Sequence, residues 1–235
     1  MQRSTWRDRT LHAVVAAATV TAVTMSGLVA ADPAVAGPHQ EIAWAPCAED
    51  PTAECGTLAV PVDWQHPAGA TFDLALARRR ATDPAARIGS LVVNPGGPGG
   101  SGVDFVIYGA DTFSADVTRR FDLVGFDPRG VARSHPVVCS AELLTAAPPS
   151  RLTSQVDFAA MVAYNRALAA DCRQRTGPLF DHVDTLSVVR DLDAIRAAVG
   201  DRKLTYYGVS YGTLIGQEYA EVFGDRIRAL VIDSN

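Results

Sequence analysis

The chain has 235 residues, of which 48% are hydrophobic and 20% are charged, a composition typical of a globular protein with one domain. Its formal net charge is −5, from 21 Lys and Arg residues against 26 Asp and Glu residues. Basic residues cluster only at Arg78-Arg79-Arg80, at the end of a strand-like run, so the basic surface of a nucleic-acid-binding protein is absent and no nucleic-acid partner is expected.

Residues 1–36 have the order of features found in a secretory signal peptide. Three arginines fall within the first nine residues, an apolar run covers 11–31, and Ala34-Val35-Ala36 forms an A-x-A cleavage site before Gly37. An uncleaved anchor is the alternative, because the run approaches the length that spans a bilayer. Its many alanines and threonines make it weakly hydrophobic. We therefore expect cleavage, secretion and no stable membrane association of the mature chain. The sequence gives no indication of oligomeric state.

Four cysteines fit an oxidising compartment. Sequence alone permits three pairings, and we favour Cys47–Cys55 with Cys139–Cys172 because both bonds then close local loops. Free buried thiols are the alternative. Metal ligation is less favoured because the chain has no C-x-x-C pair and no closely spaced histidines, so no metal and no cofactor is expected.

The first predicted elements form an antiparallel hairpin. Residues 56–64 and 71–78 alternate between apolar and polar side chains, with turn residues at 65–69 between them. The next strand, Ile88–Val93, is largely apolar, which is typical of a strand buried on both faces.

A glycine-rich loop, Asn94–Gly102, follows this strand. Five glycines in nine residues leave peptide N–H groups free to face a ligand, and its two prolines favour a shaped turn over a flexible loop. A phosphate-binding loop is the other functional reading, but no Lys-Ser/Thr pair follows the glycines.

The remaining pattern alternates helices with strands. The expected elements are a helix at 103–110, a strand at 121–126 ending in Asp127-Pro-Arg-Gly130, irregular helix over 140–180 with a break at 146–149, a helix from Asp184-Thr185 to Gly200, a strand before Gly208, a helix at 214–223 and a strand at 229–233. This order predicts an α/β fold in which the hairpin leads into a mostly parallel, doubly wound sheet. Catalytic residues of such sheets gather at the carboxyl ends of the strands.

The stretch Gly208-Val-Ser210-Tyr211-Gly212 is a G-x-S-x-G motif between a strand and a helix. In that context the motif predicts a nucleophile elbow, a strained turn that exposes the Ser210 hydroxyl. Gly208 and Gly212 leave room for the strand and the helix to approach each other. The alternative is an ordinary turn, because G-x-S-x-G also occurs by chance, but the flanking strand and helix favour the nucleophile elbow.

Three motifs together resemble those of the α/β-hydrolase fold: the glycine-rich loop, Asp127-Pro-Arg-Gly130 and the elbow. Over residues 41–235 they resemble, more narrowly, the secreted bacterial tripeptidyl aminopeptidases, serine exopeptidases related to prolyl aminopeptidases. The resemblance implies that Ser210 is the nucleophile. It also implies an oxyanion hole made by the N–H of Tyr211 and one from Gly96 or Gly97, of which Gly97 is favoured.

The same resemblance implies a triad acid and histidine after the serine, yet 25 residues follow Ser210 and all five histidines precede it. We expect His135 and His182 to be surface or packing residues, and Asp127 and Arg129 to brace the neighbouring loop. Residues 37–235 therefore resemble the N-terminal part of an α/β-hydrolase domain that is C-terminally incomplete, without the lid and the last strands.

Two classes of function are consistent with these residues. The first is a secreted serine hydrolase, an aminopeptidase that releases tripeptides from free N-termini, or alternatively a carboxylesterase acting on a small ester. The second is a non-catalytic remnant or binding protein, favoured by the lack of a histidine after Ser210. The nucleotide sequence just past Asn235 would distinguish a fragment from a remnant.

Overall fold

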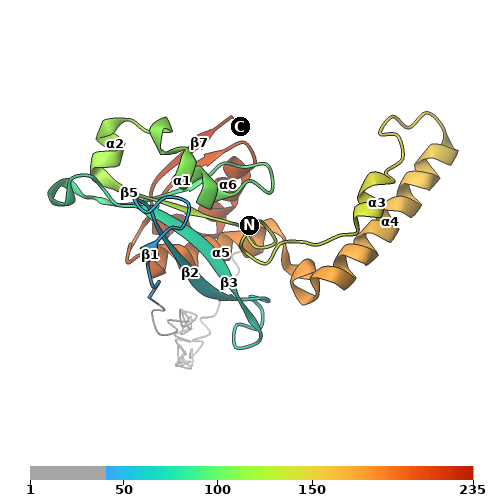
Figure 1. Ribbon diagram of the computed structural model, residues 1–235, viewed down its shortest axis with the longest axis horizontal. Helices are drawn as coiled ribbons and strands as arrows, with labels where there is room; N and C mark the ends of the chain where they lie inside the picture. The colour runs from blue at the N-terminus through green and yellow to red at the C-terminus, as the bar shows by residue number, and fades with distance from the viewer. Residues whose placement is uncertain (1–40, 235) are drawn as a thin grey trace, which may run out of the picture. The chain divides into compact units, whose positions relative to one another are not determined.

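The structure is a computed structural model that describes residues 41–234 (Figure 1). The predicted signal peptide, together with His12 and His39, lies outside the described residues. The strands are β1 (Ala45–Pro46), β2 (Glu54–Pro61), β3 (Thr71–Arg79), β4 (Gly89–Asn94), β5 (Phe121–Phe126), β6 (Leu204–Val209) and β7 (Ile227–Asp233). The α-helices are α1 (Gly102–Tyr108), α2 (Ala115–Arg120), α3 (Ala141–Thr145), α4 (Gln155–Thr176), α5 (Thr185–Ala198) and α6 (Tyr211–Phe223). The 3₁₀ turns are η1 (Pro84–Ala86), η2 (Ala110–Thr112), η3 (Pro178–His182) and η4 (Gly224–Arg226).

The seven strands form one mixed sheet in the order β1-β2-β3-β5-β4-β6-β7. β2 and β3 are the predicted hairpin, and β3 continues antiparallel against β5. The strands β5, β4, β6 and β7 run parallel to one another, so the sheet is divided between an antiparallel and a parallel part. Sequence patterns missed β1, which has two residues, and α2, whose six residues carry no apolar stripe.

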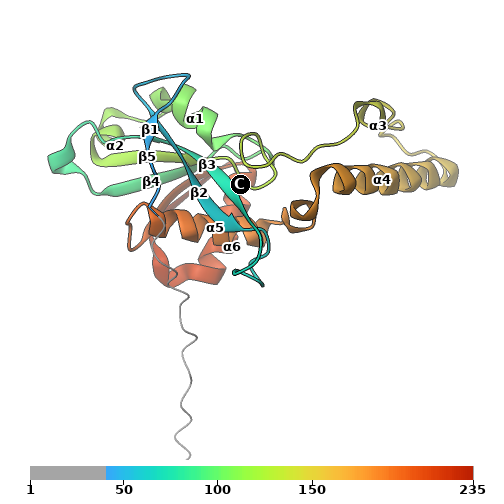
Figure 2. The same cartoon turned by 60° about the horizontal axis from the view of Figure 1, so that its bottom comes forward.

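Helices cover both faces of the sheet, α1 and α2 on one side and α5 and α6 on the other (Figure 2). Successive strand residues point to opposite faces, and this alternation divides the core. In β4, for example, Val92 packs toward α5 and α6, whereas Leu91 and Val93 pack toward α1. All six residues of β4 are buried, which confirms the prediction of a strand covered on both faces.

Parallel pairing brings the three predicted loops to one edge of the sheet. The carboxyl ends of β4, β5 and β6 lie at the same edge because these strands run in one direction. In the register of β4 and β6, Asn94 is the partner of Gly208. The glycine-rich loop and the elbow therefore begin from neighbouring backbone positions.

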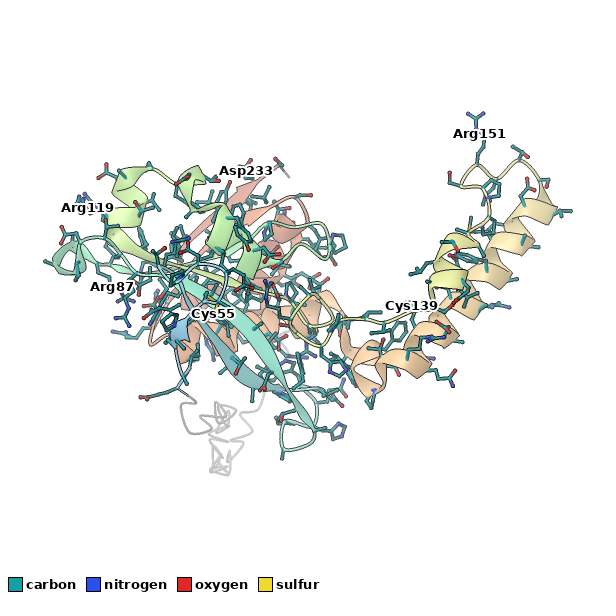
Figure 3. The ribbon with its side chains drawn as sticks, in the orientation of Figure 1. Cys55, Arg87, Arg119, Cys139, Arg151 and Asp233 are labelled. Carbon is teal, nitrogen blue, oxygen red and sulfur yellow. A yellow bond between two sulfur atoms is a disulfide. The ribbon has the colours of Figure 1, made fainter. Side chains whose placement is uncertain are left out.

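The segment between β5 and α5 contains the predicted break and two helices. In both ribbon views α3 and α4 lie side by side and away from the sheet. The Cys139–Cys172 disulfide joins the chain two residues before α3 to α4, and Figure 3 labels Cys139. The second disulfide joins Cys47 to Cys55, so both bonds are those predicted from the spacing of the cysteines.

Candidate active site

Ser210 lies on the turn between β6 and α6 with φ 52° and ψ −118°. A non-glycine residue at positive φ is strained, and surrounding contacts hold it there. The Ser210 N–H donates to the carbonyl oxygen of Asp233 at the end of β7 (2.9 Å), a residue labelled in Figure 3. A Cβ on Gly208 would overlap the carbonyl oxygen of Gly212, so the two motif glycines permit the sharp turn. The side chain of Ser210 is exposed.

The glycine-rich loop packs directly against this turn. Gly96 has φ +87°, and a Cβ there would overlap the carbonyl oxygen of Val209. The same position lies 2.9 Å from the backbone nitrogen of Tyr211 and 3.0 Å from the Cβ of Ser210. Only glycine fits, because a side chain would push the loop away from the elbow.

The hydrogen bonds of the loop distinguish between its two candidate oxyanion donors. The Gly96 N–H donates to Oδ1 of Asn94 (2.9 Å), so Gly96 is not a free donor and that part of the prediction needs correction. Neither the Gly97 N–H nor the Tyr211 N–H has an acceptor within residues 41–234. Tyr211 is the first residue of α6, where N–H groups have no partner inside the helix and the helix dipole favours negative charge. Of the three predicted donors, the N–H groups of Gly97 and Tyr211 are therefore the ones without an acceptor among the described residues.

Asn94 is a site residue whose role the sequence did not reveal. It is 1% exposed, and its Oδ1 must be the acceptor because a backbone N–H can only donate. Its Nδ2 has no hydrogen-bond partner among the described residues. A local signal could have pointed to this role, because an Asn side chain that hydrogen-bonds the backbone two residues further along the chain favours a turn.

Asp127 holds the far end of the glycine-rich loop. Its fully buried carboxylate accepts hydrogen bonds from the Ser101 hydroxyl (2.5 Å) and from the backbone nitrogens of Val103 (3.3 Å) and Arg133 (3.0 Å). Because Ser101 also caps α1, Asp127 fixes both the loop and the start of that helix. This is the predicted bracing role.

Arg129 holds together segments that lie far apart in the sequence. Its guanidinium group makes two bonds to the Asp191 carboxylate (2.6 and 2.7 Å) and donates to the carbonyl oxygens of Val62 (2.9 Å), His182 (3.0 Å) and Pro61 (3.2 Å). All five N–H groups of the side chain are thus used. The sequence patterns did not single out Asp191, although a carboxylate on the apolar face of α5 indicates a buried partner.

The histidines of the described residues have other contacts. His66 lies 2.6 Å from Asp63, and the Nε2 of His135 lies 3.2 Å from the carbonyl oxygen of Thr176. The Nδ1 of His182 is 4.0 Å from Asp63. Between residues 41 and 234, no hydrogen bond or ion pair joins a histidine to Ser210.

Within the described part of the chain, no group of three His, Cys, Asp or Glu side chains is placed to hold a metal ion. None of the helices in that part combines the length and the apolar character needed to cross a bilayer.

The sharp serine turn beside a free pair of backbone N–H groups, at the carboxyl edge of a partly parallel sheet, defines a class of protein. The chain belongs to the α/β hydrolase fold family, whose model matches residues 89–235. This confirms the fold class predicted from the sequence.

Three curated relatives are similar to the chain over most of its length. It is 46% identical to the serine protease Hip1 of Mycobacterium tuberculosis over 210 residues, which cover 83% of this chain and 39% of the relative. It is 39% identical to the tripeptidyl aminopeptidase of Streptomyces lividans over 203 residues, 82% of this chain and 38% of the relative. Carboxylesterase B of M. tuberculosis is 38% identical over 188 residues, 77% of this chain and 36% of the relative. The chain thus spans less than half the length of each relative.

Proposed function

We propose that the chain carries the nucleophile and the oxyanion-binding part of a secreted serine hydrolase, an aminopeptidase that releases tripeptides from free N-termini. The observation that carries this proposal is the exposed Ser210 on its strained turn, beside the free N–H groups of Gly97 and Tyr211. The similarity to a serine protease and to a tripeptidyl aminopeptidase supports peptides as the substrate class.

In the proposed reaction the Ser210 Oγ attacks the carbonyl carbon of the scissile bond. The carbonyl oxygen becomes an oxyanion and accepts hydrogen bonds from Gly97 and Tyr211. The serine proton passes to a base and from the base to the leaving amine as the C–N bond breaks, which leaves an acyl-enzyme. Water then attacks the ester carbonyl, and Ser210 regains its proton when the peptide is released.

Secretion is part of the proposal, and two observations support it. Both disulfides lie within the described residues, which fits an oxidising compartment. The order of features in residues 1–36 supports export with cleavage before Gly37. Intact-mass analysis of the secreted protein checks this, because retention of residues 1–36 would contradict the cleavage.

Two other candidate functions have their own support. Similarity to a carboxylesterase favours the same acyl-enzyme chemistry on a small ester. The contacts of His66, His135 and His182 with groups other than Ser210 favour a non-catalytic binding protein.

One experiment separates these three functions. The purified chain is incubated with a tripeptide p-nitroanilide that has a free amine, with its N-acetylated form, and with p-nitrophenyl butyrate, each with and without added imidazole as an external base. The variants are Ser210→Ala and, as the matched control, Ser114→Ala, whose hydroxyl makes no capping hydrogen bond. Mass spectrometry locates any acylated residue.

We expect an acyl adduct on Ser210 and an imidazole-dependent rate that Ser210→Ala abolishes and Ser114→Ala retains. A preference for the free-amine peptide supports the aminopeptidase. Turnover of the ester alone supports the carboxylesterase. No adduct on Ser210 under any condition supports the non-catalytic protein and overturns the proposal.

A further inference from the structure

A small pocket lies where the three loops meet, beside the elbow. It has a volume of about 80 Å³, and Gly96 and Tyr211 form part of its wall. Gly96 packs within van der Waals distance of the Ser210 turn, and Tyr211 follows the serine directly. The pocket, called here the elbow pocket, is therefore within reach of a group attached to a carbonyl that Ser210 attacks.

Most of the remaining wall of the elbow pocket is apolar. It is formed by Pro98, Pro128, Val131, Val183, Val188 and Ile215. Val188 and Ile215 are 6% and 3% exposed and lie deep in the core, whereas Val183 is 37% exposed and lies at the rim. Burial of an aliphatic group against such a wall is favourable because it removes apolar surface from water.

The polar groups of the elbow pocket carry no charge that is free to bind a ligand. Arg129 contributes to the wall, but its five N–H groups are all bonded to Asp191 and to backbone carbonyls. The hydroxyl groups of Thr185 and Tyr211 lie 2.6 Å apart and bond to each other. Asn94 also lines the pocket, and its neutral Nδ2 has no hydrogen-bond partner among the described residues. A charged side chain would lose its hydration for at most this one uncharged amide donor and no opposite charge, so the pocket disfavours acidic and basic groups.

We propose that the elbow pocket receives the side chain of the substrate residue whose carbonyl group Ser210 attacks, and that it selects a small, uncharged aliphatic side chain. The Cα of that residue is bonded directly to the attacked carbon, which places its side chain nearest to Gly96 and Tyr211. A volume of about 80 Å³ holds about three groups of the size of water, which matches the side chain of valine or proline. Larger aromatic side chains exceed it. This inference rests on the proposed function and deepens it.

The test measures binding, so that it is independent of turnover. The ¹⁵N-labelled chain with Ser210→Ala is titrated with the amides Ala-Ala-Gly-NH₂, Ala-Ala-Val-NH₂, Ala-Ala-Asp-NH₂ and Ala-Ala-Trp-NH₂, and dissociation constants are obtained from amide shifts. The same titrations are made with the added substitution Val183→Phe, which fills the pocket from its rim. The matched control is Val156→Phe on α4, at a residue that is 77% exposed.

We expect the valine peptide to bind about tenfold or more tightly than the glycine peptide, and the aspartate and tryptophan peptides to gain nothing over glycine. Val183→Phe should remove the advantage of valine, and Val156→Phe should leave it unchanged. Equal binding of the four peptides, no binding of any, or a valine preference that survives Val183→Phe overturns the inference. Selective binding without any Ser210 adduct in the acylation experiment would instead retain the pocket and reject the peptidase.

Discussion

Replacing Asp191 by Asn tests how strongly the Arg129 network supports the site. The substitution keeps the shape of the side chain but removes the charge that faces Arg129. Both side chains are 0% exposed, so the guanidinium group would remain buried without a counter-charge. In Asp191 both carboxylate oxygens accept from Arg129, and one also accepts from the indole N–H of Trp64 (2.9 Å). In the Asp191→Asn variant one of these oxygens is replaced by an NH₂ group, so a donor would face another donor.

The size of the effect follows from these contacts. Removal of one partner of a buried ion pair costs about 3–5 kcal/mol. For a domain of this size each 1 kcal/mol lowers the melting temperature by about 2–4 °C, so Asp191→Asn should lower it by about 6–20 °C. In the double variant Arg129→Met/Asp191→Leu both charges are gone. The carbonyls of Pro61, Val62 and His182 still lose their donor, at about 1–3 kcal/mol each, so the double variant should stay at least about 3 kcal/mol less stable than the parent.

Thermal unfolding followed by near-ultraviolet circular dichroism at neutral pH measures these changes. The control is Asp181→Asn, in an ion pair with Arg173 whose side chains are 49% and 60% exposed. Such exposed pairs contribute about 0–1 kcal/mol, so this variant should shift the melting temperature by less than about 4 °C. A shift for Asp191→Asn as small as that of the control would refute the reasoning, as would full recovery in the double variant.

Three further predictions concern the loop, a disulfide and the acid limb of stability. Gly96→Ala should lower the melting temperature more than Gly99→Ala. Both glycines have positive φ (87° and 97°), but only the methyl group added at Gly96 would overlap other atoms. Equal shifts in melting temperature would contradict the close packing of Gly96 against the elbow. Removal of Cys139–Cys172, with 33 residues of separation, should cost about 3–4 kcal/mol in urea unfolding, and an unchanged midpoint would contradict this. Thr52, through its hydroxyl and N–H, and then Arg79 lower the pKa of Asp50 from 3.8 to about 2. The stability from ionised Asp50 is therefore present above the ordinary pKa and is lost as the pH falls through about 2. Asp50→Asn should flatten the acid titration of stability between about pH 4 and pH 2, and an unchanged titration would count against the role of Asp50.

Local features of the sequence were enough to predict much of the site. The positions of Ser210, Gly208 and Gly212 follow from a motif in which a strand passes directly into a helix. The hairpin, β4 and the helix α5 follow from periodicity, because a side chain's face is set by its spacing from its chain neighbours. Conversely, β1 has two residues and α2 has no apolar stripe, so neither left a periodic signal.

The sequence by itself determined which residues stand at the carboxyl ends of the parallel strands, and with them the fold family and the serine turn. Only the tertiary structure decided which backbone donors are free, because the Gly96 N–H is bonded to Asn94 whereas the Gly97 N–H is not. It also joined Arg129 to Asp191, 62 residues further along the chain. The physical reason is that strand and turn signals depend on adjacent residues. Hydrogen-bond partners and pocket walls instead depend on segments that meet only when the sheet and its helices have packed.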